Sequence, residues 1–201
     1  ILVGALMLVA WRGGRREPTL GYLGAVQLIG ALATLIISLR AFELVTPAVV
    51  LGNTLMMLSY GLLWTGMRRF AGREASVLGI CAGAGLWLLA CLWPGFMASL
   101  PLRVKFYSLL AVIYCLLAAS ELWRSRRALE VTLWPSLGLL LFNACFYFVR
   151  LLFDPGLPSE ASTGREATFF AVLVFETLLV SVGMAFTTLT MVRDRAELKL
   201  R

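Results

Sequence analysis

The sequence predicts an all-α membrane protein, a bundle of seven transmembrane helices whose last helix continues into a cytoplasmic linker. Three observations predict this fold. The 201 residues are 60% hydrophobic, and their mean hydropathy is +0.87. Only 14% of them are charged, whereas an ordinary soluble domain has about 25%. Apolar segments of about the 20 residues that a spanning helix needs recur along the chain, and the absence of strand-like alternation disfavours a barrel.

Seven apolar segments can be separated. They cover residues 1–11, 19–39, 47–67, 75–96, 104–123, 133–153 and 167–192. We expect the first to be the surviving part of a longer span, because the chain begins without Met inside an apolar run. Most connectors are short, which makes consecutive helices antiparallel neighbours in one bundle. The long connector 154–166 consists of turn formers and is expected to be an external cap.

The last segment runs into the charged tail without a Gly, Pro or Asn stop. We therefore expect one continuous helix that leaves the membrane as a rigid rod. Residues 1–192 would form the transmembrane sensory domain, and residues 193–201 would begin a signalling helix toward an output domain beyond this sequence. The candidate signalling residues are Val192, Arg193, Ala196 and Leu198, although their heptad pattern is weak.

Basic residues divide unevenly between the two sides of the predicted bundle. Thirteen of the 18 fall after odd-numbered segments or in the tail: Arg12, Arg15, Arg16, Arg68, Arg69, Arg73, Arg124, Arg126, Arg127, Arg193, Arg195, Lys199 and Arg201. The other five are Arg40, Arg103, Lys105, Arg150 and Arg165. The positive-inside rule makes the first set cytoplasmic, with the N-terminus outside and the C-terminus inside. This distribution explains the net charge of +7 without a nucleic-acid partner.

The chain contains no His, which removes the usual haem and metal ligand and the Ser-His or Cys-His nucleophile pair. Four cysteines lie inside apolar segments without CxxC spacing: Cys81, Cys91, Cys115 and Cys145. We interpret them as small core residues, not as disulfides or metal ligands. No catalytic residue, metal ligand or cofactor site is assigned to this chain.

Polar side chains inside the segments form the candidate site, because each needs a partner or a task at membrane depth. One helical face of the sixth segment carries Asn143, Tyr147 and Arg150, and Asp154, the first residue after the segment, continues this face. The seventh segment adds Glu176, Thr177 and Ser181, the third Asn53, Thr54 and Ser59, and the second Gln27. The strongest candidates are Asn53, Asn143, Tyr147, Arg150, Glu176 and Thr177. They could be a buried structural network, a pocket for a small hydrophobic or anionic ligand open to the outside, or a proton or ion path.

A second cluster marks the inner end of the third segment. It comprises Trp64, Arg68, Arg69, Phe70 and Arg73. Aromatic residues and arginines in this arrangement are typical of a cytoplasmic membrane boundary, where the arginines face anionic headgroups. Gly72 is expected to stop the helix. We expect Glu121, near the inner end of the fifth segment, to pair with Arg124 three residues later.

The stretch NTLMMLSYGLLWTGMRRFAGR at 53–73, with the exit sequence VRDRAELKLR at 192–201, resembles the N-terminal multi-span sensory region of bacterial diguanylate cyclases. The resemblance implies a dimeric sensor in the bacterial inner membrane that controls cyclic di-GMP synthesis. A GGDEF catalytic domain, using GTP and Mg, would follow Arg201. This chain has no GGDEF motif, so by itself it is not expected to be an enzyme.

A small transporter or channel is the alternative. Its path would use Gln27, Asn53, Asn143 and Glu176 near the midplane, but the sequence shows no internal repeat of the kind that transporters commonly have. A retinal-binding photoreceptor is disfavoured, because the seventh segment has no Lys for a Schiff base.

Overall fold

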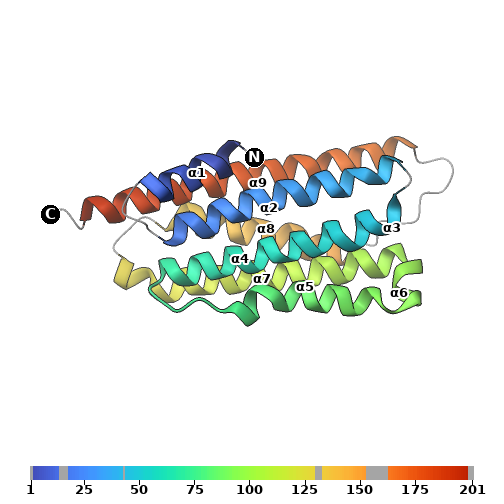
Figure 1. The fold of residues 1–201 in the computed structure, drawn as a ribbon, viewed down its shortest axis with the longest axis horizontal. Coiled ribbons are helices and arrows are strands. Elements are labelled where there is room, and N and C mark those ends of the chain that lie inside the picture. The colour runs from blue at the N-terminus through green and yellow to red at the C-terminus, as the bar shows by residue number, and fades with distance from the viewer. Residues whose placement is uncertain (1, 14–17, 43, 130–132, 153–162, 199–201) are drawn as a thin grey trace.

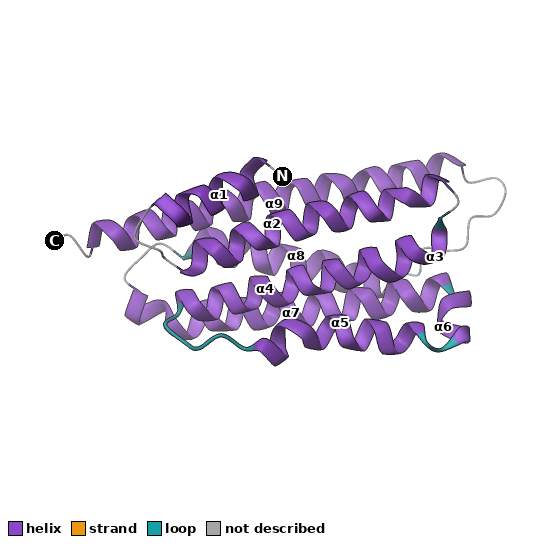
Figure 2. Ribbon diagram, in the orientation of Figure 1, coloured by secondary structure: helices purple, strands orange, loops and turns teal. Residues whose placement is uncertain are grey.

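The structure, a computed structural model, describes residues 2–13, 18–42, 44–129, 133–152 and 163–198. Over these ranges the chain is helical apart from short turns, and they contain no strand (Figure 2). The elements are α1 (Leu2–Gly13), α2 (Pro18–Ser38), η1 (Leu39–Phe42), α3 (Val45–Pro47), η2 (Ala48–Gly52), α4 (Asn53–Phe70), α5 (Val77–Cys91), α6 (Pro94–Ala98), α7 (Leu100–Leu129), α8 (Trp134–Leu152) and α9 (Thr163–Leu198).

Five helical stretches are long and apolar enough to cross a membrane. They are Thr19–Ser38, Val45–Phe70, Leu100–Arg126, Trp134–Leu152 and Phe175–Asp194. The prediction of an all-helical, multi-pass membrane protein is therefore confirmed at this level. The two remaining apolar segments are shorter helices, α1 with 12 residues and α5 with 15. α5 ends at Cys91 because Pro94 cannot continue a helix and instead starts the short α6.

Five helices close a ring in the order α2, α4, α7, α8 and α9, with α9 returning to α2 (Figure 1). α1 packs on the outside of α2, and α5 packs on the outside of α4. The helices run lengthwise, so that the ends of α4, α7 and α9 and the start of α8 lie together at one end of the bundle. The Arg-rich ends predicted from the sequence consequently share that end, which we call the arginine end.

Glycines let α4, α5 and α7 approach one another closely. A Cβ on Gly61 of α4 would lie 2.5 Å from the carbonyl oxygen of Ile80 on α5. The Tyr114 hydroxyl of α7 accepts a hydrogen bond from the Gly83 N–H and donates one to the Gly79 carbonyl, both at 2.8 Å. These contacts require glycine on the inner faces of both helices.

α4 ends in a Schellman turn, which confirms the predicted stop at Gly72. Gly72 has φ of 80°, a conformation that favours glycine. Its N–H donates to the Arg69 carbonyl at 3.1 Å, and the Arg73 N–H donates to the Arg68 carbonyl at 2.9 Å. The turn folds Arg73 back beside the last turn of α4, next to Arg68.

α9 is one unbroken helix of 36 residues, about 54 Å long at 1.5 Å per residue. The predicted rod is confirmed as far as Leu198, and residues 199–201 lie outside the described part of the chain. α9 packs against α8 and α2. Large apolar side chains on its other faces are exposed, including Phe175 at 68% and Phe186 at 73%.

The prediction that all four cysteines lie in the core is wrong for two of them. All four are free thiols, and Cys115 is buried while Cys91 is half-buried. Cys81 and Cys145 are exposed. The reason is that α5 and α8 each pack by one face, and the apolar composition of a membrane helix does not reveal which face this is.

Replacing Gly61 by Ala tests the contact between α4 and α5. The new methyl group would meet the Ile80 backbone, which cannot turn aside. We expect Gly61→Ala to lower the free energy of unfolding in detergent by about 1–3 kcal/mol, the usual cost of overpacking. Gly85→Ala is the matched control, because an added Cβ there has no neighbouring atom within 4 Å, and it should be neutral or slightly stabilising. Equal losses in both variants would contradict the close contact.

Candidate functional site

Three tyrosines from three helices meet inside the ring. Tyr60 comes from α4, Tyr107 from α7 and Tyr147 from α8. The Tyr60 and Tyr147 rings meet edge to face with centroids 6.3 Å apart, and the Tyr107 and Tyr147 centroids are 5.8 Å apart. Tyr107 and Tyr147 are 9% and 6% exposed. Each ring brings a hydroxyl group into an apolar interior, so the cluster is polar at its centre and aromatic around it.

Charged and amide groups adjoin these tyrosines. The Arg150 guanidinium carbon lies 5.9 Å from the Tyr107 centroid and 5.8 Å from the Tyr147 centroid, within cation–π range. Glu176 enters from α9, is 4% exposed and interacts electrostatically with Arg150 and Tyr147. Asn143, one turn from Tyr147 on α8, is 3% exposed, and its carbonyl oxygen accepts no hydrogen bond from the described residues. We call these five residues, together with Tyr60, the tyrosine site.

The structure thus brings together four of the six sequence-predicted candidates: Asn143, Tyr147, Arg150 and Glu176. The predicted helical face of α8 points into the ring as far as Arg150, and Asp154 lies outside the described residues. The site offers a cation, a carboxyl group and an amide within one aromatic enclosure, which can hold either an internal network or an anionic or carbonyl ligand. Its deepest members are almost fully buried, so a ligand from outside would need a helix to move.

The other two candidates occupy different surroundings. The Asn53 side-chain amide donates to the Val49 carbonyl of its own helix at 3.0 Å, and its neighbour Thr54 donates likewise to Val50 at 2.6 Å. Both follow the π-helical turn η2, a local distortion that recurs at functional sites. Thr177 is exposed on α9 beside the buried Glu176, with which it forms a side-chain hydrogen bond.

Gln27 and Ser181 join α2 to α9 by a reciprocal pair of hydrogen bonds. The Gln27 amide nitrogen donates to the Ser181 carbonyl at 2.9 Å, and the Ser181 hydroxyl donates to the Gln27 amide oxygen at 2.5 Å. Next to them, the Ser59 hydroxyl of α4 donates to the Val26 carbonyl of α2 at 3.2 Å. Side chains from the predicted spans therefore link α2, α4 and α9 by hydrogen bonds in the same region of the bundle.

At the arginine end, one buried carboxylate forms ion pairs with two arginines. Glu121 of α7 is 4% exposed and forms ion pairs of 3.0 Å with both Arg68 and Arg73. Arg68 also donates from Nε to the Glu74 carbonyl at 3.2 Å, and its guanidinium lies 5.2 Å from the Trp64 centroid. The predicted Glu121–Arg124 pair is wrong. Arg124 is exposed, because Glu121 faces α4, where the Schellman turn gathers two nearer arginines.

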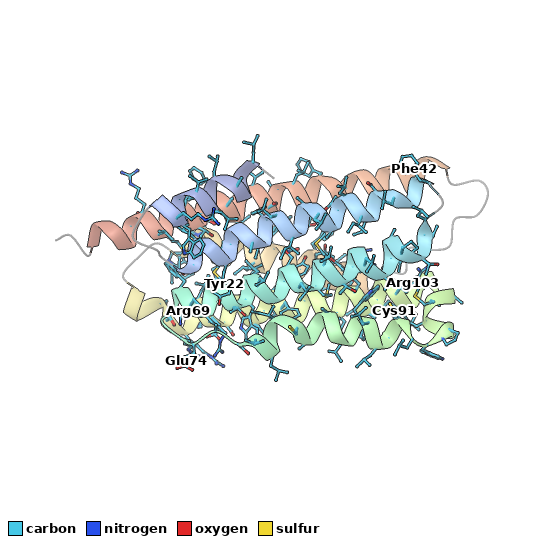
Figure 3. All side chains as sticks on the ribbon, in the orientation of Figure 1. Tyr22, Phe42, Arg69, Glu74, Cys91 and Arg103 are labelled. Atoms are coloured by element: carbon cyan, nitrogen blue, oxygen red, sulfur yellow. The ribbon has the colours of Figure 1, made fainter. Side chains whose placement is uncertain are left out.

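The remaining boundary residues divide between surface and core. Arg69 is half-buried at the arginine end (Figure 3). Phe70, which we expected at the membrane interface, is instead 1% exposed and belongs to the hydrophobic core. Trp64 is half-buried, with its ring 6.4 Å from that of Tyr114. Figure 3 also places Arg103 and Cys91 at the opposite end of the bundle from Arg69 and Glu74.

The C-terminal half of α9 is anchored by Met191, which is 1% exposed and whose sulfur accepts a hydrogen bond of 3.5 Å from the Ser136 hydroxyl of α8. Val192 is half-buried and Arg193 exposed. Ala196 and Leu198 lie on the helical backbone, but their side chains fall outside the described ones.

Sequence reasoning missed Tyr60 and Tyr107 as members of the site. A usable signal was present, because all five tyrosines of the chain fall within apolar segments, where each hydroxyl needs a polar partner. What the sequence did not contain was the ring order that brings α4, α7 and α8 together.

A double-mutant cycle tests the link between Gln27 and Ser181. We expect Gln27→Leu to lower the free energy of unfolding by about 1–2 kcal/mol, because two interhelical hydrogen bonds are lost. Ser181→Ala should cost less, and the coupling between the two changes should be about 0.6–1.7 kcal/mol, as for other hydrogen bonds between membrane helices. Thr34→Val is the control, since the Thr34 hydroxyl bonds only within α2. Strictly additive losses would show that the pair is not formed.

The sequence matches no protein-family model and no curated protein, and the fold matches no solved structure.

Proposed function

We propose that the chain is a seven-span sensory and dimerisation module that controls an attached cytoplasmic output domain, a diguanylate cyclase that makes cyclic di-GMP. In this proposal α1 and α5 complete the seven spans, the arginine end is cytoplasmic and the protein resides in the bacterial inner membrane. The observation that carries the proposal is the continuity of α9, which runs without a break from the buried Glu176 to Leu198.

The mechanism follows from how α9 is held. Its inward contacts include Glu176 in the tyrosine site, Ser181 against Gln27 and Met191 against Ser136. The helix from Glu176 to Leu198 is about 33 Å long, so a small rotation or shift at the tyrosine site reaches the cytoplasmic end as a rigid movement. A stimulus would act by binding more tightly to one of two arrangements of α9 than to the other.

Dimerisation is part of the proposal, because the expected cyclase domains work in pairs. Exposed apolar residues of α9 recur at spacings of four and three: Phe175, Leu179, Val182, Phe186 and Leu189. This is the pattern of a helix seam, which two copies of α9 could share in the membrane. A rotation of α9 would then change the spacing of the two output domains.

Substitution of Glu176 tests the role of the tyrosine site in signalling. We expect Glu176→Gln to raise basal cyclic di-GMP production by the full-length protein about five-fold, because losing about 1 kcal/mol of attraction to Arg150 shifts the two arrangements by that factor. The measurement is nucleotide output in membranes containing equal amounts of protein. Leu178→Met is the control, since Leu178 is 58% exposed on the same helix. Unchanged basal and stimulated output in both Glu176→Gln and Arg150→Gln would remove the site from the mechanism.

An insertion series tests transmission through the rod. One to seven Ala residues are inserted after Leu198 in the full-length protein, and each turns the output domain by about 100°. We expect output to change most with two residues and to recover with seven, which complete about two turns. The same insertions beside a flexible Gly-Ser interruption should show no periodicity. A steady change with insert length, without recovery at seven, would contradict a rigid helical output.

A small transporter or channel is the second candidate. The observation that favours it is the π-helical turn Ala48–Gly52 directly before Asn53, since distorted helices frame the substrate sites of many transporters. Flux into liposomes that contain the purified chain distinguishes the two. Flux that Asn53→Leu abolishes would support the transporter, and its absence would favour the sensor.

A further inference from the structure

A groove opens at the arginine end between α7 and α8. Its volume is about 190 Å³, and it is lined by Leu122, Trp123, Arg126, Leu133, Trp134 and Leu137. The apolar stretch of α7 that could cross a membrane ends at Arg126, and that of α8 begins at Trp134. The groove therefore lies where two spans leave the hydrocarbon and meet the headgroup layer.

The walls of the groove match the two parts of a lipid. Its floor is apolar, because Leu122, Leu133 and Leu137 are each less than 10% exposed. Its sides are two indole rings, Trp123 and Trp134, which meet edge to face with centroids 6.0 Å apart and are 45% and 69% exposed. Exposed indoles at this depth are typical of contacts with the glycerol and headgroup region of a bilayer.

The charge at the rim determines which lipid fits. The Arg126 guanidinium lies 4.1 Å from the Trp123 centroid and donates to the Trp123 carbonyl at 2.9 Å, so it is held in place over the groove. Arginine has five N–H donors, and this bond uses one of them. The guanidinium attracts the phosphate of any phospholipid, but the ammonium group of a zwitterionic lipid offsets this attraction, so an anionic lipid is favoured.

Other arginines at this end are engaged differently. Arg68 and Arg73 are both ion-paired with the buried Glu121, so one of their two positive charges is balanced within the protein. Arg126 combines an exposed guanidinium with an adjoining apolar groove, and the N-terminal end of α8 adds its partial positive charge. We propose that this groove is a binding site for an anionic phospholipid, whose phosphate pairs with Arg126 and whose glycerol and upper acyl chain lie on the two indoles and the leucine floor.

The test is a lipid titration of the purified full chain in detergent. Brominated phosphatidylglycerol or brominated phosphatidylcholine is added at rising mole fraction, and quenching of tryptophan fluorescence is followed. We expect saturable quenching by the anionic lipid at a mole fraction about ten-fold lower than for phosphatidylcholine. Trp134→Phe should remove part of the saturable signal, which places the bound lipid at the groove.

Matched arginine variants decide the role of the rim charge. Arg126→Gln should weaken the saturable phase for phosphatidylglycerol by about five- to ten-fold and leave that for phosphatidylcholine unchanged. Arg124→Gln removes another exposed charge, two residues away, that does not line the groove, and it should have less than a two-fold effect. Elution volume and thermal unfolding show whether each variant is folded, and Arg126→Lys provides a second variant that keeps the charge. Equal quenching by both lipids, or equal effects of Arg126→Gln and Arg124→Gln, would overturn the proposal.

Discussion

A polar group inside the bundle is stabilised when it finds a partner within the protein, because hydrocarbon offers none. This constraint explains the order of the ring. Gln27 of α2 reaches Ser181 of α9 across 154 residues of sequence, and the Arg150 guanidinium of α8 lies against the rings of α7 and α8. Each such contact fixes one pair of helices. Apolar side chains alone would leave the helices free to pack in other orders, since lipid is as apolar as they are.

The same constraint limits what sequence can predict. Apolar segments, the stop at Gly72, the inward face of α8 and the unbroken α9 follow from local composition and periodicity, and all are found. The partner of Glu121 cannot be predicted from local sequence. Helical spacing favours Arg124, but the fold of α4 places Arg68 and Arg73 at 3.0 Å from the carboxylate. Spacing along a helix describes its own surface and says nothing about which neighbouring helix covers it.

The composition of a membrane helix also does not show which of its faces points into the protein. In a soluble helix the polar face identifies the surface, whereas in a membrane helix both the lipid-facing and the inward residues are apolar. For this reason the sequence predicts a core position for Cys81 and Cys145, which are exposed, and an interfacial position for Phe70, which is buried. The tyrosines are the exception. A tyrosine hydroxyl in an apolar segment needs a polar partner, so an inward position for Tyr60 and Tyr107 could have been expected from the sequence alone.

The two proposed sites are connected through one helix. The groove between α7 and α8 includes Trp134 and Leu137 at the start of α8, and Ser136, between them, contacts the buried Met191 of α9. In the proposals above, a lipid in the groove would contact the part of α8 that holds the C-terminal half of α9. The tyrosine site would act on the same helix at Glu176. Occupancy of the groove by an anionic lipid would then set how freely α9 can turn, and signalling would depend on membrane composition as well as on the stimulus.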